Sequence, residues 1–251
     1  MKTVIIVQAR MTSTRLPGKV LKTVLGKPLL EYQLERLQRV SLADQIVVAT
    51  TVNETDQPIV DLCVRLSIPV YRGSEEDVLA RYYEAATQFA AEVIVRVTSD
   101  CPLIDPELID RVIAQYQENH PRDSYVANFS LDRRTYPRGL DVEVFSYQAL
   151  KEANQEAFEA HQREHVTPFI YQNPTRYTLA ALHGDRDYSY HRWTVDTPED
   201  FALIRLLLEE LTPVHPQFSF QDVLTLLEQH PAWIEINAHI EQKKLVLSEV
   251  N

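Results

Sequence analysis

Short apolar runs alternate with segments of helical spacing over the first hundred residues. Residues 3–9 (TVIIVQA) are a β-branched run bounded by polar residues, which predicts a buried strand. After a polar loop, leucines recur at helical spacing behind Pro28, which suits a first helical turn. The same alternation predicts strands at 45–51, 68–73 and 92–100, and helices at 58–67 and 74–90, the last with Ser74 as its N-cap.

Strands and helices that alternate with short connections build an α/β fold, a doubly wound and mostly parallel sheet covered by helices on both faces. Such sheets bind ligands at the carboxyl ends of their strands. The loop after residue 9 and the carboxylate of Asp100, which ends the strand at 92–100, are therefore expected at the same edge.

The alternation changes in the second half of the chain. A helix is expected from Pro106 to about residue 120, followed by strands at 124–129 and 140–146 with no helix between them, which predicts a small antiparallel flap over the site. The remaining predictions are helical spacing over about 146–172, strands at 177–182 and 190–195, a helix at 198–211 opened by Pro198, and two shorter helices beyond Pro213.

Length and composition fit one large domain. The chain has 251 residues, 45% of them hydrophobic, and no linker or repeat divides it. We expect residues 1–212 to form this domain, including the flap around 124–146, and residues 213–251 to extend it with helices. Two cysteines cannot make a disulfide framework, and no apolar stretch suits a signal peptide or a membrane span. A reducing cytoplasm fits best.

The net charge limits the partners of the chain. Asp and Glu outnumber Lys and Arg by 36 to 25, a formal charge of -11, which argues against nucleic acid and against anionic membranes. An anionic substrate therefore needs a local basic patch or a divalent metal. No membrane insertion is expected, because no apolar segment is long enough.

The loop RMTSTRLPGKV supplies such a basic patch behind the first strand. Arg10, Arg15 and Lys19, with backbone N–H groups around Ser13, can surround a polyphosphate. The loop is not a Walker A motif, because Ser13 stands where that motif has its first glycine and Val20 follows the lysine. The alternative is a basic loop that is merely solvated.

Two acids follow predicted strands and can hold a metal. Asp100 ends the strand at 92–100, and Asp196 ends the one at 190–195. Mg²⁺ prefers one or two protein carboxylates together with phosphate oxygens and waters. Asp196 could alternatively be a helix N-cap, but two strand-terminal acids facing one basic loop favour metal-assisted phosphoryl or nucleotidyl transfer.

These segments resemble the cytidylyltransferases that activate 3-deoxy-manno-octulosonate and acylneuraminate sugars. The resemblance lies in QARMTSTRLPGKVL, GKPLL, TSDCPLID and VDTPED. RGSEEDVLARYYEAA, YPRGLDVEVF and REHVTPFIY are similar to the branch of the spore-coat polysaccharide protein SpsF. The resemblance spans roughly residues 3–205 and implies a nucleotide-diphospho-sugar transferase-like fold, CTP as donor, Mg²⁺ as cofactor and release of pyrophosphate. The resembling families are often homodimers, so the resemblance makes a homodimer possible, although the oligomeric state does not follow from the sequence itself.

The resemblance also implies roles for single residues. The catalytic group is Lys19, Arg10 and Asp100, and the metal ligands are Asp100 and Asp196. Further substrate contacts are expected at Ala9, which would approach the base, and at Ser13, Arg15, Arg72, Arg138, Asp141, Glu143 and His165. Arg138 would pair with a substrate carboxylate and the two acids of the flap would take hydroxyls, the alternative for these acids being an ordinary solvated strand face.

Two other motifs have competing interpretations. His161, Glu164 and His165 match H-x-x-E-H, a zinc-protease signature, but no third ligand stands out downstream. Cys101 lies beside Asp100 without a paired histidine nearby in the sequence, so a buried structural cysteine is favoured over a nucleophile.

The resulting hypothesis is transfer of CMP from CTP to a sugar acid for surface polysaccharide or glycan biosynthesis, with release of pyrophosphate. One alternative keeps the site but uses another nucleotide such as GTP. A second alternative is a non-catalytic nucleotide- or sugar-binding component of a polysaccharide pathway.

Overall fold

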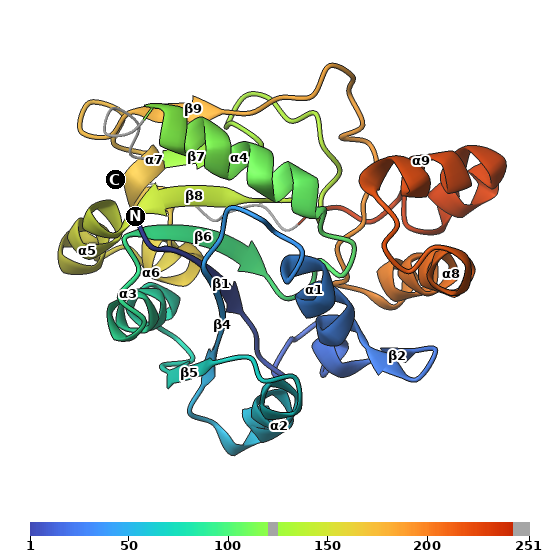
Figure 1. Cartoon of the computed structure of the whole chain (residues 1–251), viewed down its shortest axis with the longest axis horizontal. Coiled ribbons are helices and arrows are strands. Elements are labelled where there is room, and N and C mark those ends of the chain that lie inside the picture. Colours follow the sequence, from blue (N-terminus) through green and yellow to red (C-terminus); the bar gives the residue numbers. More distant parts are fainter. Residues whose placement is uncertain (120–124, 243–251) are drawn as a thin grey trace.

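A seven-stranded sheet forms the centre of the computed structural model, which describes residues 1–119 and 125–242 (Figure 1). Its strand order is β5-β4-β1-β6-β8-β7-β9. Four strands are parallel neighbours, as predicted: β5 (Val70–Gly73), β4 (Gln45–Thr51), β1 (Thr3–Gln8) and β6 (Val93–Thr98). The predicted mostly parallel α/β fold is therefore confirmed.

The other three strands extend the sheet beyond β6. Strand β8 (Glu143–Ser146) is antiparallel to β6 and to β7 (Tyr125–Ala127), and β9 (Leu179–Ala181) is parallel to β7. The predicted antiparallel pair thus belongs to the main sheet, while a separate two-stranded sheet is formed by β2 (Thr23–Val24) and β3 (Lys27–Pro28). Residue 124, the predicted start of the flap, lies outside the described residues.

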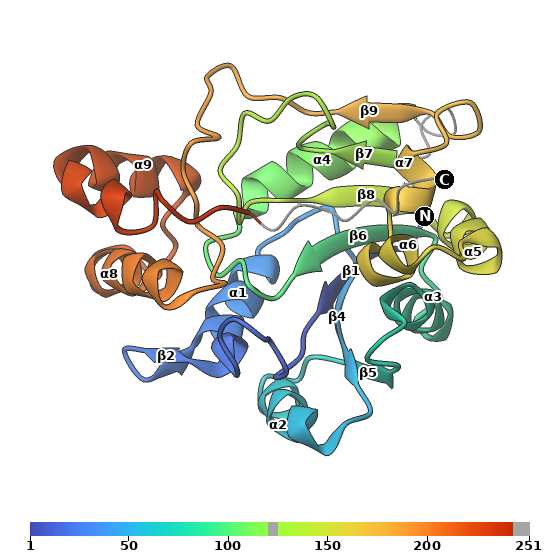
Figure 2. The same cartoon turned by 180° about the vertical axis from the view of Figure 1, so that it is seen from behind.

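Helices cover both faces of the sheet (Figures 1 and 2). Alternate residues of β1 explain this, because Ile5 and Val7 belong to one apolar cluster and Val4 and Ile6 to the other. The first cluster includes residues of α1 (Leu29–Leu37), α2 (Gln57–Arg65) and α4 (Pro106–Asn119). The second includes residues of α3 (Val78–Gln88), α5 (Tyr147–Glu156) and α7 (Pro168–Tyr171).

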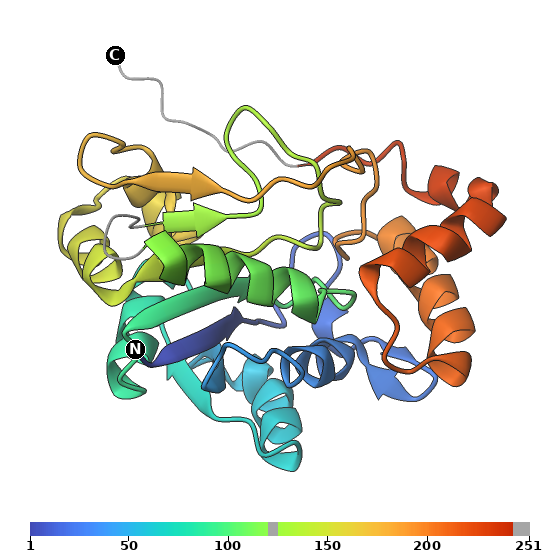
Figure 3. The same cartoon turned by 45° about the horizontal axis from the view of Figure 1, so that its top comes forward.

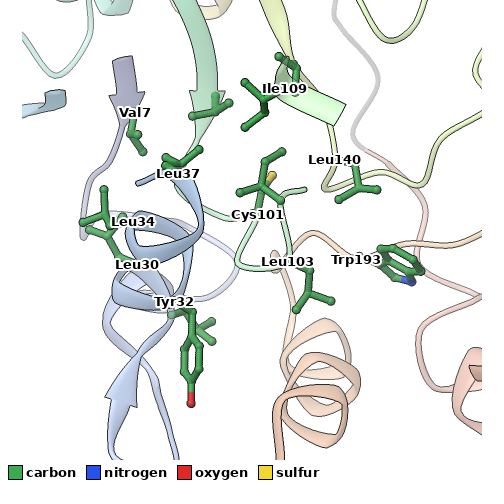
Figure 4. Packing of buried hydrophobic residues seen from close by; sticks show 14 of the residues in the cluster. Val7, Leu30, Tyr32, Leu34, Leu37, Cys101, Leu103, Ile109, Leu140 and Trp193 are labelled. Atoms are coloured by element: carbon green, nitrogen blue, oxygen red, sulfur yellow. The ribbon is translucent and has the colours of Figure 1, made fainter. Parts of the chain in front are cut away.

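The first cluster reaches the edge of the sheet where the candidate site lies. Figure 4 shows Val7 of β1, Leu34 of α1 and Cys101 in this cluster, together with Trp193, which is fully buried. A side chain of this size removes a large apolar area from water, and its position fixes the chain on either side. The segment that leads to Asp196 is therefore part of the core.

Several predicted elements form with shifted ends. The helix predicted from Ser74 begins at Val78, because the Asp77 side chain accepts the N–H of Ala80 and is the N-cap. The spacing over 146–172 is broken into α5, α6 (Ala160–His165) and α7, because the backbone is extended at Ala157 and Val166 adopts φ 73°. The helix expected to run to about His120 is described up to Asn119.

The strand predicted at 190–195 does not form. This segment makes an isolated bridge between Arg138 and Arg192, with the N–H of Trp193 donating to Arg138 O at 2.7 Å. Gly139 makes the close approach feasible: it has φ 101°, and a Cβ there would lie 2.5 Å from Thr194 N. The segment follows this loop and the carbonyl of Asp100 instead of a neighbouring strand.

The last part of the described chain forms helices, as expected. Helix α8 (Pro198–Val214) starts with a capping box and lies beside α9 (Phe220–Gln229) at one end of the molecule (Figure 3). A 3₁₀ helix over Pro231–Ile236 follows, and shorter 3₁₀ turns occupy Lys19–Leu21 and Glu54–Asp56. Residues 243–251 of the expected extension lie outside the described residues. In the described chain, none of the helices has the length and apolar character needed to cross a bilayer.

Candidate active site

A polar cavity of about 1030 Å³ opens at the carboxyl ends of β1 and β6. Ala9 and Asp100, which follow these two strands, line it, as the parallel sheet predicts. The other predicted site residues in its wall are Arg10, Ser13, Arg15, Lys19, Arg138, Asp141, Glu143, His165 and Asp196.

Lys19 joins the two predicted metal ligands. Its Nζ donates to Asp100 Oδ2 at 2.9 Å and to Asp196 Oδ1 at 2.8 Å. Asp196 is reached from a second side, because its Oδ2 lies 2.9 Å from Arg15 Nη2. The structure thus brings together four of the predicted residues around one centre of alternating charge.

Electrostatics keep Lys19 and Asp100 ionised. Burial would lower the pKa of the Lys19 ammonium, but the charges and hydrogen bonds of Asp100 and Asp196 outweigh burial and raise that pKa. Burial would also raise the pKa of the Asp100 carboxyl, yet Lys19 and a hydrogen bond from Thr98 lower it to about 2. Burial raises the pKa of the Cys101 thiol well above its ordinary value, which disfavours a thiolate nucleophile.

The basic loop between β1 and Lys19 is fixed by backbone and carboxylate contacts. The N–H of Gly18 donates to Met11 O at 2.9 Å, and the N–H of Met11 donates to Asp56 Oδ1 at 2.7 Å. Asp56 is fully buried and also accepts the hydroxyl of Thr51. A loop held at both ends can present its N–H groups and cations to a polyphosphate without first being ordered.

The carboxylates fit a divalent cation. Oxygens of Asp100 and Asp196 converge on one cation, the Lys19 ammonium, and two carboxylates with phosphate oxygens and waters are the donors that Mg²⁺ prefers. Over residues 1–119 and 125–242, no group of three His, Cys, Asp or Glu residues could hold a metal. The zinc interpretation of His161, Glu164 and His165 is therefore unsupported, and phosphate oxygens would have to complete a site at Asp100 and Asp196.

Comparison with known proteins gives the family. Residues 4–249 match the sequence profile of the family described as cytidylyltransferase. This chain belongs to the cytidylyltransferase family. It is accordingly a nucleotidyltransferase, and the predicted family is confirmed.

Full-length relatives agree with this assignment. This cytidylyltransferase is 38% identical over 245 residues to an uncharacterised protein of Methanocaldococcus jannaschii, covering 97% of each chain. It is 33% identical over 233 residues to the spore coat polysaccharide biosynthesis protein SpsF of Bacillus subtilis, covering 90% of this chain and 94% of SpsF. A solved cytidylyltransferase from Leptospira borgpetersenii is 30% identical, with a TM-score of 0.89 over 97% of this chain and 100% of that one.

A further relative matches only part of the cytidylyltransferase. The 3-deoxy-manno-octulosonate cytidylyltransferase of Geobacter sulfurreducens is 38% identical over 114 residues, 45% of each chain. The alignment covers less than half of either protein. This similarity alone therefore does not identify the acceptor substrate of this chain.

The half of the cavity lined by Arg96, Arg134, Arg138, Asp141 and Glu143 contains arginine–carboxylate pairs. Arg134 binds Asp141 with both terminal nitrogens, Nη2 lying 3.2 Å from Oδ2. Glu143 is buried and accepts hydrogen bonds from Arg96, from the Tyr125 hydroxyl at 2.7 Å and from the Thr167 hydroxyl at 2.6 Å. Both acids thus already have partners, and Asp141 precedes β8 rather than lying on it with Glu143 as predicted.

Arg138 differs from these paired arginines. Its half-buried side chain faces the cavity and makes neither an ion pair nor a hydrogen bond with any residue of the described chain. Burial and the nearby charge of Arg134 lower the pKa of its guanidinium, which is still protonated at neutral pH. Arg138 is therefore the cation in this half best placed to receive an anionic group.

Two predicted residues have other surroundings than expected. Arg72 lies outside the cavity wall and donates to Thr51 O, Asn53 O and Gln57 Oε1 at 2.9–3.0 Å. Its predicted substrate contact finds no support in this arrangement. His165 does line the cavity, at the end of α6.

Arg163, which precedes His165 by two residues in the segment REHVTPFIY, links two helices. It lies 2.5–3.0 Å from the Asp77 carboxylate and thereby ties α6 to the start of α3. Glu75 is a further cavity residue that the sequence pattern does not predict. It accepts hydrogen bonds from Arg10 at 3.4 Å, from Thr12 and from Asn53. A single carboxylate in an acidic run gives no sequence signal for such contacts.

Arg192 and Asp200 are further residues that sequence reasoning missed. Arg192 Nη2 donates to Asp196 Oδ2 at 2.9 Å, and Arg192 Nε donates to Asp200 Oδ1 at 2.8 Å. The spacing of Thr197 and Asp200 is typical of a capping box. Thr197 is therefore the N-cap of α8, and Asp196 is not.

Proposed function

We propose that this cytidylyltransferase transfers CMP from CTP to the hydroxyl of a sugar acid and releases pyrophosphate, in a Mg²⁺-dependent reaction of surface polysaccharide or glycan biosynthesis. The contact of Lys19 with both Asp100 and Asp196, on the wall of a cavity that also contains Arg10 and Arg15, carries the proposal. The name of the Geobacter sulfurreducens relative and that of SpsF support the acceptor class and the pathway class.

The reaction is a displacement at the α-phosphorus of CTP. An acceptor hydroxyl oxygen forms a bond to that phosphorus, the bond to the pyrophosphate oxygen breaks, and the proton of the hydroxyl passes to water. Such transfers need positioning and charge neutralisation more than covalent help from the protein. Lys19, Arg10 and Arg15, which line the cavity, would neutralise the charge that grows on the leaving pyrophosphate.

Asp100 and Asp196 would hold Mg²⁺, in keeping with their shared cation. When bound, the metal supplies charge neutralisation on the phosphates and favours the deprotonated acceptor oxygen. Arg138 would pair with the acceptor carboxylate, because its guanidinium faces the cavity without a partner in the described chain. A cytoplasmic location stays a prediction from the sequence, and a homodimer stays one from the resemblance.

Pyrophosphate release tests the proposal. The purified protein is assayed with each of the four nucleoside triphosphates, with and without Mg²⁺, against a set of sugar acids and their reduced, uncharged counterparts. We expect release with CTP, Mg²⁺ and a sugar acid only. Release with GTP would change the nucleotide, release with the uncharged sugars would remove the carboxylate requirement, and binding without release would favour the non-catalytic alternative.

A further inference from the structure

The Asp196 carboxylate rests on a buried network that continues behind it. Asp200 is fully buried, and its Oδ2 accepts the N–H of Asp196 at 2.9 Å and that of Thr197 at 3.1 Å. The same carboxylate receives Arg192 through Nε at 2.8 Å and Nη2 at 3.0 Å. Since Arg192 Nη2 also donates to Asp196 Oδ2, the guanidinium ties the two acids together.

The chain after α9 completes this network. Figure 2 shows the segment after α9 running back from its end of the molecule towards the sheet. Asn237, 2% exposed, donates through Nδ2 to Asp200 Oδ1 at 2.8 Å and to the Arg192 carbonyl at 2.9 Å. Gln242 lines the cavity and accepts from Arg192 Nη1 at 2.6 Å.

These contacts decide which way Asp196 faces. With Oδ2 taken by Arg192 and Arg15, Oδ1 is left for Lys19 and for the side of the cavity that Asp100 occupies. Arg192 can hold this direction only while its own nitrogens and carbonyl are fixed. A buried acceptor that loses its partner costs free energy. Removal of Asn237 would take this donor from the Arg192 carbonyl and leave Asp200 Oδ1 with Arg192 Nε, so that the network can rearrange.

We propose that Asn237 is a positioning residue for Asp196, and that residues 237–242 thereby form part of the machinery that presents this carboxylate to a divalent metal. The inference rests on the proposed function, because it takes Asp196 as a metal ligand. Partners of metal ligands commonly set the orientation of the ligand and the affinity for the metal. Residues 237–242, which contain no recognisable motif, would thus contribute to the reaction by orienting Asp196.

The test compares variants by the Mg²⁺ concentration that gives half-maximal CTP binding in calorimetric titrations. Asn237→Asp keeps the size of the side chain but loses both donated hydrogen bonds and brings a second carboxylate to Asp200. Asn237→Ala removes the group altogether. Gln242→Ala removes only the contact to Arg192 Nη1 and alters an exposed residue, so its folding is not at risk.

Ser219→Ala is the matched control. It removes the capping box of α9, which lowers stability in the same part of the chain without touching Arg192, Asp196 or Asp200. Asp196→Asn shows how much the half-saturating Mg²⁺ concentration rises when the proposed metal ligand itself is removed. Melting temperatures of all variants separate a loss of stability from a change in metal requirement.

We expect both Asn237 variants to raise the half-saturating Mg²⁺ concentration about tenfold or more, and to lower turnover with little change in the KM for the acceptor. Gln242→Ala is expected to raise the Mg²⁺ requirement by about threefold, and Ser219→Ala to leave it unchanged while lowering the melting temperature. This pattern supports a positioning role, because a purely structural asparagine would behave as Ser219 does.

Other patterns overturn the proposal. If Asn237 and Gln242 variants keep the Mg²⁺ requirement of Ser219→Ala while Asp196→Asn raises it, the segment has no positioning role. If Asp196→Asn leaves the requirement unchanged, or the unsubstituted protein binds CTP without Mg²⁺, Asp196 holds no metal and the proposal fails with it. If Mg²⁺-dependent binding responds as expected but no sugar acid is turned over, the positioning role stands and the proposed reaction fails.

Discussion

The Lys19 ammonium and the Asp196 carboxylate lie 2.8 Å apart, although 177 positions separate them in the chain. The same ammonium lies 2.9 Å from Asp100, so Lys19 bridges the two carboxylates. The lysine thus occupies a place between the carboxylates that a divalent cation would share. The lysine and the metal are therefore expected to compete unless a triphosphate draws Lys19 away.

Substitution of Lys19 by methionine tests this competition. Without the ammonium, Asp100 and Asp196 lose the cation that they share, although Asp196 keeps Arg15 and Arg192, so Mg²⁺ alone should raise the melting temperature of Lys19→Met more than that of the unsubstituted protein. Turnover should fall by about 10²-fold or more, because charge on the leaving group loses its partner. Lys22→Met, whose ammonium lies over the Phe201 ring, is the control. Equal Mg²⁺-induced shifts in both variants would refute the competition.

Asp100→Asn should leave the fold intact and reduce turnover by about 10²-fold or more, because the amide is a poor metal ligand and cannot pair with Lys19. Asn has nearly the same shape, and the hydrogen bond from the Thr98 hydroxyl can persist. Circular dichroism melts and pyrophosphate release with CTP and Mg²⁺ give the two readouts. Near-normal turnover in a folded variant contradicts the assigned role.

Arg138→Ala should raise the acceptor KM about tenfold or more, because a hydrogen-bonded ion pair with a carboxylate is lost, and should leave the KM for CTP within about twofold. Arg133→Ala is the matched control, since it removes an exposed arginine of the same loop. Initial rates at varied acceptor and varied CTP separate the two constants. An unchanged acceptor KM would place the substrate carboxylate elsewhere.

Gly139→Ala should destabilise the protein by about 2–4 kcal/mol and reduce turnover, because strained backbone and a clash occur together. The added Cβ would lie 2.5 Å from Thr194 N and from Trp193 C, atoms of the residues two and three positions before Asp196. Gly26→Ala is a control with positive φ and open space around its Cβ position, and it should cost only about 1–2 kcal/mol. Urea unfolding of the two variants makes the comparison, and equal losses would mean that the close approach at Gly139 is unimportant.

Stability should fall as the pH drops below about 6.5, with His191 as one source. Burial lowers the pKa of His191 to about 4, whereas the unfolded chain has the ordinary value of 6.5. The unfolded state therefore binds more protons between these values, and the folded state loses about 2 kcal/mol of stability from this residue between pH 7 and pH 5. Urea unfolding at the two pH values measures the loss. His191→Gln should reduce the difference, and an identical pH dependence in the variant would exclude His191 as its source.

The sequence predicts the first half of this fold well because β1, β4 and β6 are apolar runs buried on both faces. Buried parallel strands need such continuous runs, so their composition alone locates them. The predicted strand at 190–195 is wrong for a related reason. Trp193 and Val195 are buried as a strand's residues would be, but their backbone pairs with Arg138 and Asp100 rather than with a neighbouring strand.

The chemistry-bearing residues divide in the same way. Asp100 and Lys19 are expected at this edge because a strand end and a basic loop show where parallel strands present their carboxyl ends. Asp196 also lines the cavity, but the strand predicted to end there does not form. Asp56, Glu75 and Asn237 could not be found, since their partners lie far along the chain and no spacing signals such contacts. Arg72 was expected to contact substrate because it lies near a strand end. The sequence does not reveal that its guanidinium already donates to the carbonyl oxygens of Thr51 and Asn53.

The order of these residues along the chain has a consequence for synthesis on the ribosome. Lys19 and Asp100 emerge early, but Asp196 comes much later, and the buried bonds of Asn237 to Asp200 and Arg192 need the segment after α9. Most of the sheet can pair while that segment is still inside the exit tunnel. An incomplete chain can thus pair its sheet, whose last strand ends at Ala181, yet still lack the contacts that hold Asp196 in the centre.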